Sequence, residues 1–314
     1  MIRLSISTLV IIVSAMFSFT AFGQTCCTAG MPVGSVLGIA NDTSSFVLNL
    51  RYEYKSINLL VDNNSRLEND PRSRSGQNIS LKFDYGLSEA WAFSVIVPFI
   101  QQRRQTVSES QRSFGLGDAI LLTQYSLNRL SLGTGVKFPT GKLSHSADSG
   151  LLLSPDMQSG SGSVDYLFRA GFSFPELFVP FLVGNLYSSY RINGVNDDFG
   201  SSATFPGRRF GFGNEYIAGF DLDYTLVGNA GFFIPHLGLQ FRNTAPNIEQ
   251  QVEAPNSGGS WLNLFAGLAF SPDSYKTISF FAEIPIYQNL EGLQITTDFG
   301  LGLQLSYKFI KTEI

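Results

Sequence analysis

The chain has 314 residues and a net charge of −4, and only 15% of its residues are charged, against about 25% in an ordinary soluble domain. Aromatic residues make up 13%, and glycine is frequent at 31 residues. There is no basic excess to indicate a nucleic-acid partner. The mean hydropathy of +0.09 is far below that of a helical membrane protein. Few charges and many aromatic residues are typical of a membrane barrel, which exposes only alternate residues to lipid.

Residues 1–23 predict a secretory signal peptide. Arg3 precedes an apolar run over residues 4–22, and the small residues Ala21 and Gly23 indicate cleavage before Gln24. A membrane anchor is the alternative, but four serines interrupt a run that is already short for a span. The mature chain would then enter the membrane through strands, because closed barrels are the other structure that satisfies every backbone group in lipid.

Residues 24–44 predict a periplasmic lead-in that contains Cys26 and Cys27. A lipoprotein would carry a cysteine at the cleavage site after a short apolar box, and residues 23–25 match that pattern poorly. Metal binding would need histidine or carboxylate neighbours. A vicinal disulfide or two periplasmic thiols remain as interpretations.

From residue 46 onward, apolar and polar side chains alternate, which predicts strands with two unlike faces. In the first strand, 46–56, Leu48 and Leu50 oppose Arg51 and Glu53. The same pattern predicts eleven further strands at 78–87, 91–104, 118–126, 131–138, 165–174, 178–191, 209–224, 231–242, 261–270, 277–287 and 297–309. The alternation is least regular in 178–191.

The last strand, 297–309, shows the pattern most clearly. One face carries only large apolar and aromatic groups, and the other carries small, polar or charged groups. Strands of soluble proteins are usually about five or six residues long. A strand of roughly ten residues or more is long enough to cross a bilayer at a tilt.

The connections alternate between short turns and long polar loops, the latter at 62–77, 105–115, 140–163, 193–207, 244–258 and 288–296. In outer-membrane barrels the short connections are periplasmic, which places both termini on the side that a signal peptide requires. We therefore predict that residues 45–309 form a transmembrane antiparallel up-and-down β-barrel of about twelve strands in the outer membrane of a Gram-negative bacterium, with residues 310–314 as a tail. Hairpins about every 45 residues also resemble a propeller, but each unit has two long strands and lacks propeller signatures.

The sequence contains little that indicates catalysis or a cofactor. Residues 135–142, GVKFPTGK, depart from a phosphate-binding loop in spacing and lack its Ser or Thr. A hydrolase would need a base, and only His145 and His236 are available. His236 is expected to point inward, near the outer half of its strand. We expect no catalytic residue, metal or cofactor.

Inward positions carry charges of both signs, which predicts a polar lumen. We expect these charged side chains to form ion pairs that fill the lumen, to line a polar path that sets selectivity, or to do both. Inward Ile100, Phe281, Pro98, Pro235 and Pro285 add apolar surface, which favours a small, partly hydrophobic solute over a large sugar. The lumen-lining candidates are Arg51, Lys82, Asp118, Lys137, Arg169, Glu215, His236, Glu283 and Asp298.

Four short motifs occur in order along the chain: GLGD at 115–118, GVKFPTG at 135–141, GSGSVDY at 160–166 and PIY at 285–287. Together they resemble the outer-membrane barrel family named for the meta-cleavage pathway of phenol degradation, over roughly residues 80–309. The resemblance implies passage of small, aromatic compounds and supplies no catalytic residues. Gly302, Leu305 and Tyr307 match the assembly signal of such barrels, while Gly300 stands in its polar position.

We therefore expect a passive outer-membrane channel for small solutes, aromatic or hydrophobic ones among them. Its expected partners are outer-membrane lipid, the solute and the outer-membrane assembly machinery. One alternative is a closed structural or surface-binding barrel whose loops 140–163 and 193–207 carry the function. A second is an outer-membrane hydrolase with His236 as the base.

Overall fold

The computed structural model describes residues 45–68, 71–202 and 206–310. The predicted signal peptide, the lead-in with Cys26 and Cys27, and residues 311–314 lie outside the described residues. None of the described residues belongs to a helix long and apolar enough to cross a membrane.

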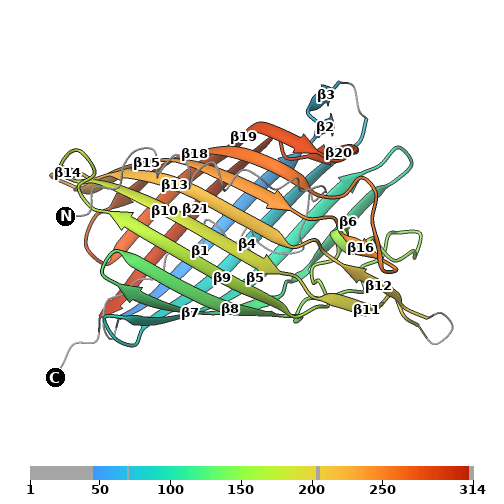
Figure 1. Cartoon of the computed structure of the whole chain (residues 1–314), viewed down its shortest axis with the longest axis horizontal. Coiled ribbons are helices and arrows are strands. Elements are labelled where there is room, and N and C mark those ends of the chain that lie inside the picture. The colour runs from blue at the N-terminus through green and yellow to red at the C-terminus, as the bar shows by residue number, and fades with distance from the viewer. Residues whose placement is uncertain (1–44, 69–70, 203–205, 311–314) are drawn as a thin grey trace, which may run out of the picture.

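Twelve antiparallel strands close into a barrel, which confirms the predicted fold and strand number (Figure 1). The first and last strands pair along their length, from Ser45 opposite Ile310 to Ser56 opposite Phe299. The strands of the wall are β1 (Ser45–Ile57), β4 (Ser73–Gly86), β5 (Trp91–Gln105), β7 (Ala119–Leu127), β8 (Leu130–Phe138), β9 (Asp165–Phe174), β10 (Leu182–Ile192), β13 (Glu215–Tyr224), β15 (Gly231–Thr244), β18 (Gly259–Ser271), β19 (Lys276–Leu290) and β21 (Phe299–Ile310).

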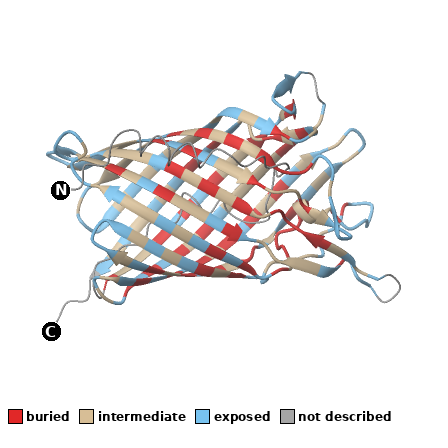
Figure 2. Cartoon of the chain, viewed as in Figure 1, coloured by how far each residue is buried: buried red, intermediate tan, exposed pale blue. Residues whose placement is uncertain are grey.

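The two faces of the wall differ as the alternation predicts. Along β21, Leu301, Leu303 and Leu305 are each about 40% exposed, while Gly302 between them is buried. Figure 2 shows the same alternation of buried and exposed residues along the other strands. Large apolar side chains exposed all around a molecule indicate a lipid-facing surface, since soluble monomers rarely expose large contiguous apolar patches.

Interior glycines make room for large side chains of neighbouring strands. A Cβ at residue 302 would lie 1.8 Å from the Phe281 ring, and one at residue 219 would lie 2.3 Å from the Tyr187 ring. In a barrel of this size the interior is narrow, so a ring fits only where the adjacent strand carries no side chain. The glycines therefore bring aromatic groups flat against the wall.

The long connections extend from one end of the barrel, and the short turns lie at the other end (Figure 1). Several segments predicted as loops contain strands, because their backbone groups pair with one another there. One sheet contains β2 (Leu59–Asp62), β3 (Ser65–Leu67) and β20 (Leu293–Thr296), and a second contains β11 (Val195–Phe199), β12 (Arg208–Gly211), β16 (Ile248–Glu249) and β17 (Val252–Glu253). Two further short strands, β6 (Ser110–Leu116) and β14 (Leu226–Gly228), pair with β5 and β15.

Several predicted strand boundaries were wrong. The strand predicted at 78–87 begins at Ser73, within the predicted loop 62–77. The segment 178–191 joins the wall only at Leu182, because Phe178 and Phe181 have positive φ angles of 65° and 66° that interrupt an extended strand. The segment 209–224 is two strands, β12 and β13. The two strands are separated at Phe212, which packs in a buried cluster with Phe199 and Phe210 and is not part of the wall.

Candidate functional site

The barrel interior is the candidate site, and the structure places all nine predicted residues on its inner side or its rim. Most of them form local ion pairs. Arg51 lies 2.7 Å from Glu53 and stacks over the Phe281 ring at 4.1 Å from its centroid. Glu283 lies 2.9 Å from Lys55 and accepts a hydrogen bond from Asn263.

Lys82 and Glu215 are also held by interior partners. Lys82 lies 3.1 Å from Asp84, which accepts a further hydrogen bond from Asn49 at 2.9 Å. Glu215 lies between two arginines, 3.1 Å from Arg191 and 2.7 Å from Arg242. A buried charge is tolerated when it is paired and hydrogen-bonded. Lys82 and Glu215 are therefore accommodated in the interior as members of ion pairs. Asp298 lies at the rim of the barrel and accepts a hydrogen bond from Ser56 at 3.1 Å.

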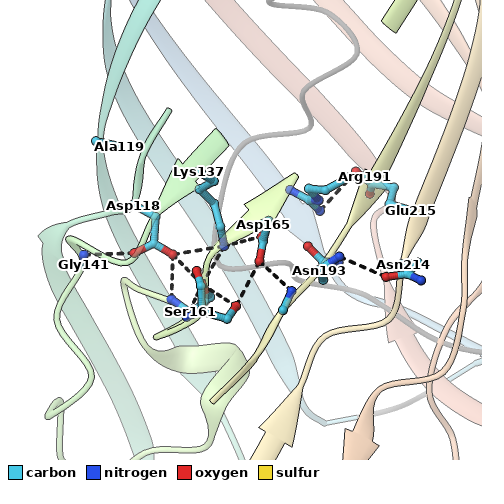
Figure 3. A network of polar contacts seen from close by, with 12 residues as sticks. Asp118, Ala119, Lys137, Gly141, Ser161, Asp165, Arg191, Asn193, Asn214 and Glu215 are labelled. Atoms are coloured by element: carbon cyan, nitrogen blue, oxygen red, sulfur yellow. Dashed lines mark hydrogen bonds and ion pairs between the residues drawn. The ribbon is translucent and has the colours of Figure 1, made fainter. Parts of the chain in front are cut away.

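Asp118 and Lys137 belong to a buried cluster at the end of the barrel that carries the long loops (Figure 3). The Lys137 ammonium lies 3.1 Å from Asp118 and 2.6 Å from Asp165. Asp118 also accepts hydrogen bonds from the backbone amides of Gly141 and Ser161, at 2.9 and 2.8 Å. The cluster thus joins three wall strands to both ends of the connection between β8 and β9.

Three of the four sequence motifs meet in this cluster. GLGD contributes Asp118, GVKFPTG contributes Lys137, and GSGSVDY contributes Asp165. A Cβ at residue 160 would lie 2.6 Å from the Gly141 carbonyl, so the two loop ends approach closely only as glycines. These motifs therefore build a loop anchor, and Asp118 and Lys137 are structural groups rather than exposed lumen surface.

The anchored loop, residues 140–163, folds into the barrel mouth. Met157, Gln158 and Ser159 in it are fully buried. Asp156 contacts two arginines of the inner wall, Arg74 of β4 at 2.5 Å and Arg104 of β5 at 3.3 Å. Burial by itself would raise the pKa of Asp156, but the two arginines outweigh it and hold the pKa below its ordinary value of 3.8. The loop therefore narrows the mouth and is fixed there by charge.

His236 contacts carboxylates and no hydroxyl nucleophile among the described residues. Its Nδ1 lies 2.8 Å from Asp223 and its Nε2 lies 3.9 Å from Asp221. It faces the interior, but the predicted outer half was wrong: β15 begins at Gly231 beside the short turn, so residue 236 lies in the half of the strand near the short turns. Because the strand starts at the short turn and runs toward the long loops, a residue early in the strand lies far from the long loops.

The second histidine contacts a serine, but in the wrong arrangement for catalysis. His145 Nε2 lies 3.0 Å from the Ser159 hydroxyl. That hydroxyl donates its own hydrogen to the Lys142 carbonyl at 3.2 Å and is fully buried. A nucleophilic serine must instead donate to its histidine. Desolvation lowers the pKa of His145, and the Lys142 charge adds to this. Among the described residues no cluster of histidine, cysteine and carboxylate groups is arranged to hold a metal.

Arg169 lines a cavity and differs from the interior cations Arg51, Lys82, Lys137 and Arg191, because no carboxylate of the described residues lies within ion-pair distance of it. The cavity is small, with a volume of about 20 Å³, and lies against β7, β8, β9, β10 and β13. Its inner lining includes Leu122, Leu167, Arg191 and Glu215. The sequence analysis did not predict the leucines as lumen residues. Leu122 stands in a strand whose outward face is also apolar, so the sequence pattern does not show that its side chain points inward.

No protein-family model and no curated protein matches the chain. Among solved structures, an outer membrane channel from Pseudomonas putida is similar, with a TM-score of 0.69 and 16% sequence identity over 86% of this chain and 97% of that chain. The β domain of a Bordetella autotransporter is also similar, with a TM-score of 0.52 and 10% identity over 85% of this chain and all of that one. Their likeness and the apolar outer face together show that this chain has the fold of an outer-membrane β-barrel.

Proposed function

We propose that this protein is a passive outer-membrane channel for small, partly hydrophobic solutes. The observation that carries the proposal is the closed barrel, which is apolar on its outer face and is lined inside by charged side chains and the Phe281 ring. The similar Pseudomonas protein is itself described as an outer membrane channel.

The interior limits the size of the solute. Ion pairs such as Arg51 with Glu53 and Lys55 with Glu283 project side chains into a lumen of twelve strands, which lies between filled eight-stranded barrels and open sixteen-stranded porins. The loop 140–163 narrows the mouth further. We therefore propose that amino-acid-sized solutes pass and that oligosaccharides do not. The interior ring of Phe281 and the side chains of Leu122 and Leu167 would favour solutes with an aromatic or aliphatic part.

The test is a swelling assay with the refolded protein in liposomes. Glycine, valine and phenylalanine form a series of zwitterions of increasing apolar size, and a disaccharide is the large control. We expect swelling with all three amino acids and none with the disaccharide. Absence of swelling with every solute, together with no conductance in a planar bilayer, would overturn the channel proposal.

A closed barrel that acts through its surface is the second candidate. The burial of Met157, Gln158 and Ser159 in the mouth and the pairing of most interior charges favour it. Removing part of the loop, residues 144–154, separates the two: in a channel, conductance rises, whereas in a closed surface-binding barrel conductance stays absent and only partner binding changes.

A hydrolase is disfavoured because, among the described residues, no serine hydroxyl donates to either histidine. The Nε2 of His236 faces Asp221, and the Ser159 hydroxyl donates away from His145. Its test is a comparison of ester and phospholipid hydrolysis by the wild-type protein and His236→Ala. Activity that is present in the wild type and absent in the variant would establish His236 as the base.

A further inference from the structure

Asp221 and Asp223 are carboxylates of the inner wall that have no lysine or arginine within ion-pair distance among the described residues. The ion-pair partner that both of them have is His236. Their side chains are 22% and 32% exposed, so water and small ions reach them. Four other interior carboxylates each lie within 3.1 Å of a lysine or arginine: Glu53, Asp84, Glu215 and Glu283. The half of the lumen near the short turns therefore holds two acidic groups without a permanent counter-charge.

The contacts of His236 fix the position of the hydrogen on its neutral ring. The residue stands opposite Asp223 in the register of β15 with β13, and its Nδ1 lies 2.8 Å from that carboxylate. Asn185 donates a second hydrogen bond to Asp223 at 3.2 Å. Because an ionised carboxylate only accepts hydrogen bonds, the neutral imidazole carries its hydrogen on Nδ1. Its Nε2 is then an acceptor that faces another acceptor, Asp221, at 3.9 Å.

Protonation of Nε2 converts this facing pair of acceptors into an attraction. The imidazolium donates from both nitrogens, so His236 then forms ion pairs with Asp221 and Asp223 together. The arrangement depends on Gly238, since a Cβ there would collide with Asp221 and would lie 3.4 Å from His236 Nε2. The ordinary pKa of histidine is about 6.5, so the cluster is suited to change its charge near neutral pH.

Few other charges face this cluster. The second neighbour of β15 is β18, which contains no titratable residue. Arg169 of β9 acts on Asp221 through space, from beyond ion-pair distance. Tyr187 of β10 accepts a hydrogen bond from Gln240 at 2.9 Å and is a neutral phenol. With Arg169 counted, the cluster has one negative charge in excess while His236 is neutral and none once His236 is protonated.

A fixed charge in a narrow lumen determines which ions pass. We propose that His236 is a proton-operated switch of ion selectivity: the neutral imidazole leaves Asp221 and Asp223 to favour cations, and the imidazolium cancels that preference. The proposal rests on the proposed channel function. It adds that solutes with an ammonium group are favoured while His236 is neutral.

The test measures the ratio of potassium to chloride permeability from the reversal potential of the refolded protein in a planar bilayer under a KCl gradient. Between about pH 8.5 and about pH 6, on either side of the ordinary histidine pKa, we expect the wild-type ratio to fall about two- to fivefold, the effect of one unit charge at contact distance in water. His236→Gln should keep the high ratio over this range, and His236→Lys should show the low ratio throughout. His145→Gln removes the other histidine of the chain and should respond like the wild type. The Asp156 contact does not titrate in this range, because the pKa of Asp156 lies below 3.8.

A wild-type ratio that does not change with pH would overturn the switch. An equal fall in His236→Gln would also overturn it, because the response would then belong to the carboxylates alone. If the His236 variants do not refold, diethyl pyrocarbonate, which acylates accessible imidazoles, is added to His145→Gln protein already inserted in the bilayer, and a pH response that persists would overturn the switch. Conductance with selectivity that is independent of pH leaves the channel and removes the switch, whereas absence of conductance at every pH removes both.

Discussion

Lys137 shows how one buried residue can organise a loop. Its ammonium is almost fully buried and lies within 3.1 Å of two carboxylates, those of Asp118 and Asp165. The sequence places these three residues on separate strands, and their meeting depends on the register of β8 with β7 and β9. Without the cation, two buried carboxylates would face each other with only hydroxyl and amide donors.

Replacing Lys137 by methionine is therefore predicted to lower the free energy of unfolding by about 3–5 kcal/mol, the typical effect of removing one partner of a buried ion pair. Urea unfolding in lipid vesicles, followed by the heat-dependent shift of the folded band on a gel, measures the change. Lys276→Met is the matched control, since Lys276 pairs with Asp273 at 3.5 Å on the exposed turn, and such pairs contribute about 0–1 kcal/mol. Equal effects of the two variants would contradict a buried role for Lys137.

At the scale of elements, the loop 140–163 acts as a constriction with two attachments. Its ends are held by the Asp118, Lys137 and Asp165 cluster, and its middle is held by Asp156 against β4 and β5. The depressed pKa of Asp156 means that its contribution to stability is present above the ordinary value of 3.8 and is lost as pH falls through the lower folded-state value. The middle attachment is therefore acid-sensitive.

We predict that acidification on the loop side of a planar bilayer raises the conductance of the wild type once the pH falls below the lowered pKa of Asp156, which is itself under 3.8, because protonated Asp156 no longer holds the loop to Arg74 and Arg104. Asp156→Asn should show the higher conductance already at pH 7. Asp148→Asn changes an exposed carboxylate of the same loop and should behave like the wild type. If Asp156→Asn conducts like the wild type at pH 7, the loop does not restrict the mouth through this contact.

The whole molecule separates two kinds of surface, with apolar side chains outside and paired charges inside. Leu303 and Gln304 are adjacent in β21 and face opposite sides of the wall. Gln304 contacts Asn49 and Ser306 within the lumen, whereas Leu303 lies outside between Tyr52 and Phe280. The barrel is stable in a membrane because both preferences are satisfied at once.

This division predicts that Leu303→Arg destabilises the folded barrel in vesicles by about 2–4 kcal/mol, the range for a charge on the lipid face near the bilayer midplane. Gln304→Arg should change stability much less, since the added charge enters a polar lumen. The folded fraction in lipid vesicles across a urea series measures both. The reverse order of sensitivity would mean that the lipid face and the lumen face are exchanged.

Local patterns in the sequence were sufficient to predict the fold. The alternation of side chains is a property of each strand by itself, so twelve strands, their inward residues and the short turns could be predicted without tertiary information. The predictions failed where the chain leaves the wall. Phe178 and Phe181 adopt positive φ angles that an extended strand does not allow. Phe212 packs in a buried cluster away from the wall, although its apolar side chain fits the alternation.

The partners of the inward residues depend on the tertiary structure. Arg51 and Glu53 are two residues apart on one face, so their pairing follows from the sequence, but the contacts of Lys137, Asp156 and Glu215 join segments brought together by strand register and by the inward fold of loop 140–163. The tertiary structure also decides which interior cation has no ion-pair partner among the described residues. Alternation depends on the pleat of a single strand, whereas pairing depends on the closed barrel, and this is why the sequence alone determined the lumen residues and only the folded molecule distinguished Arg169 from the others.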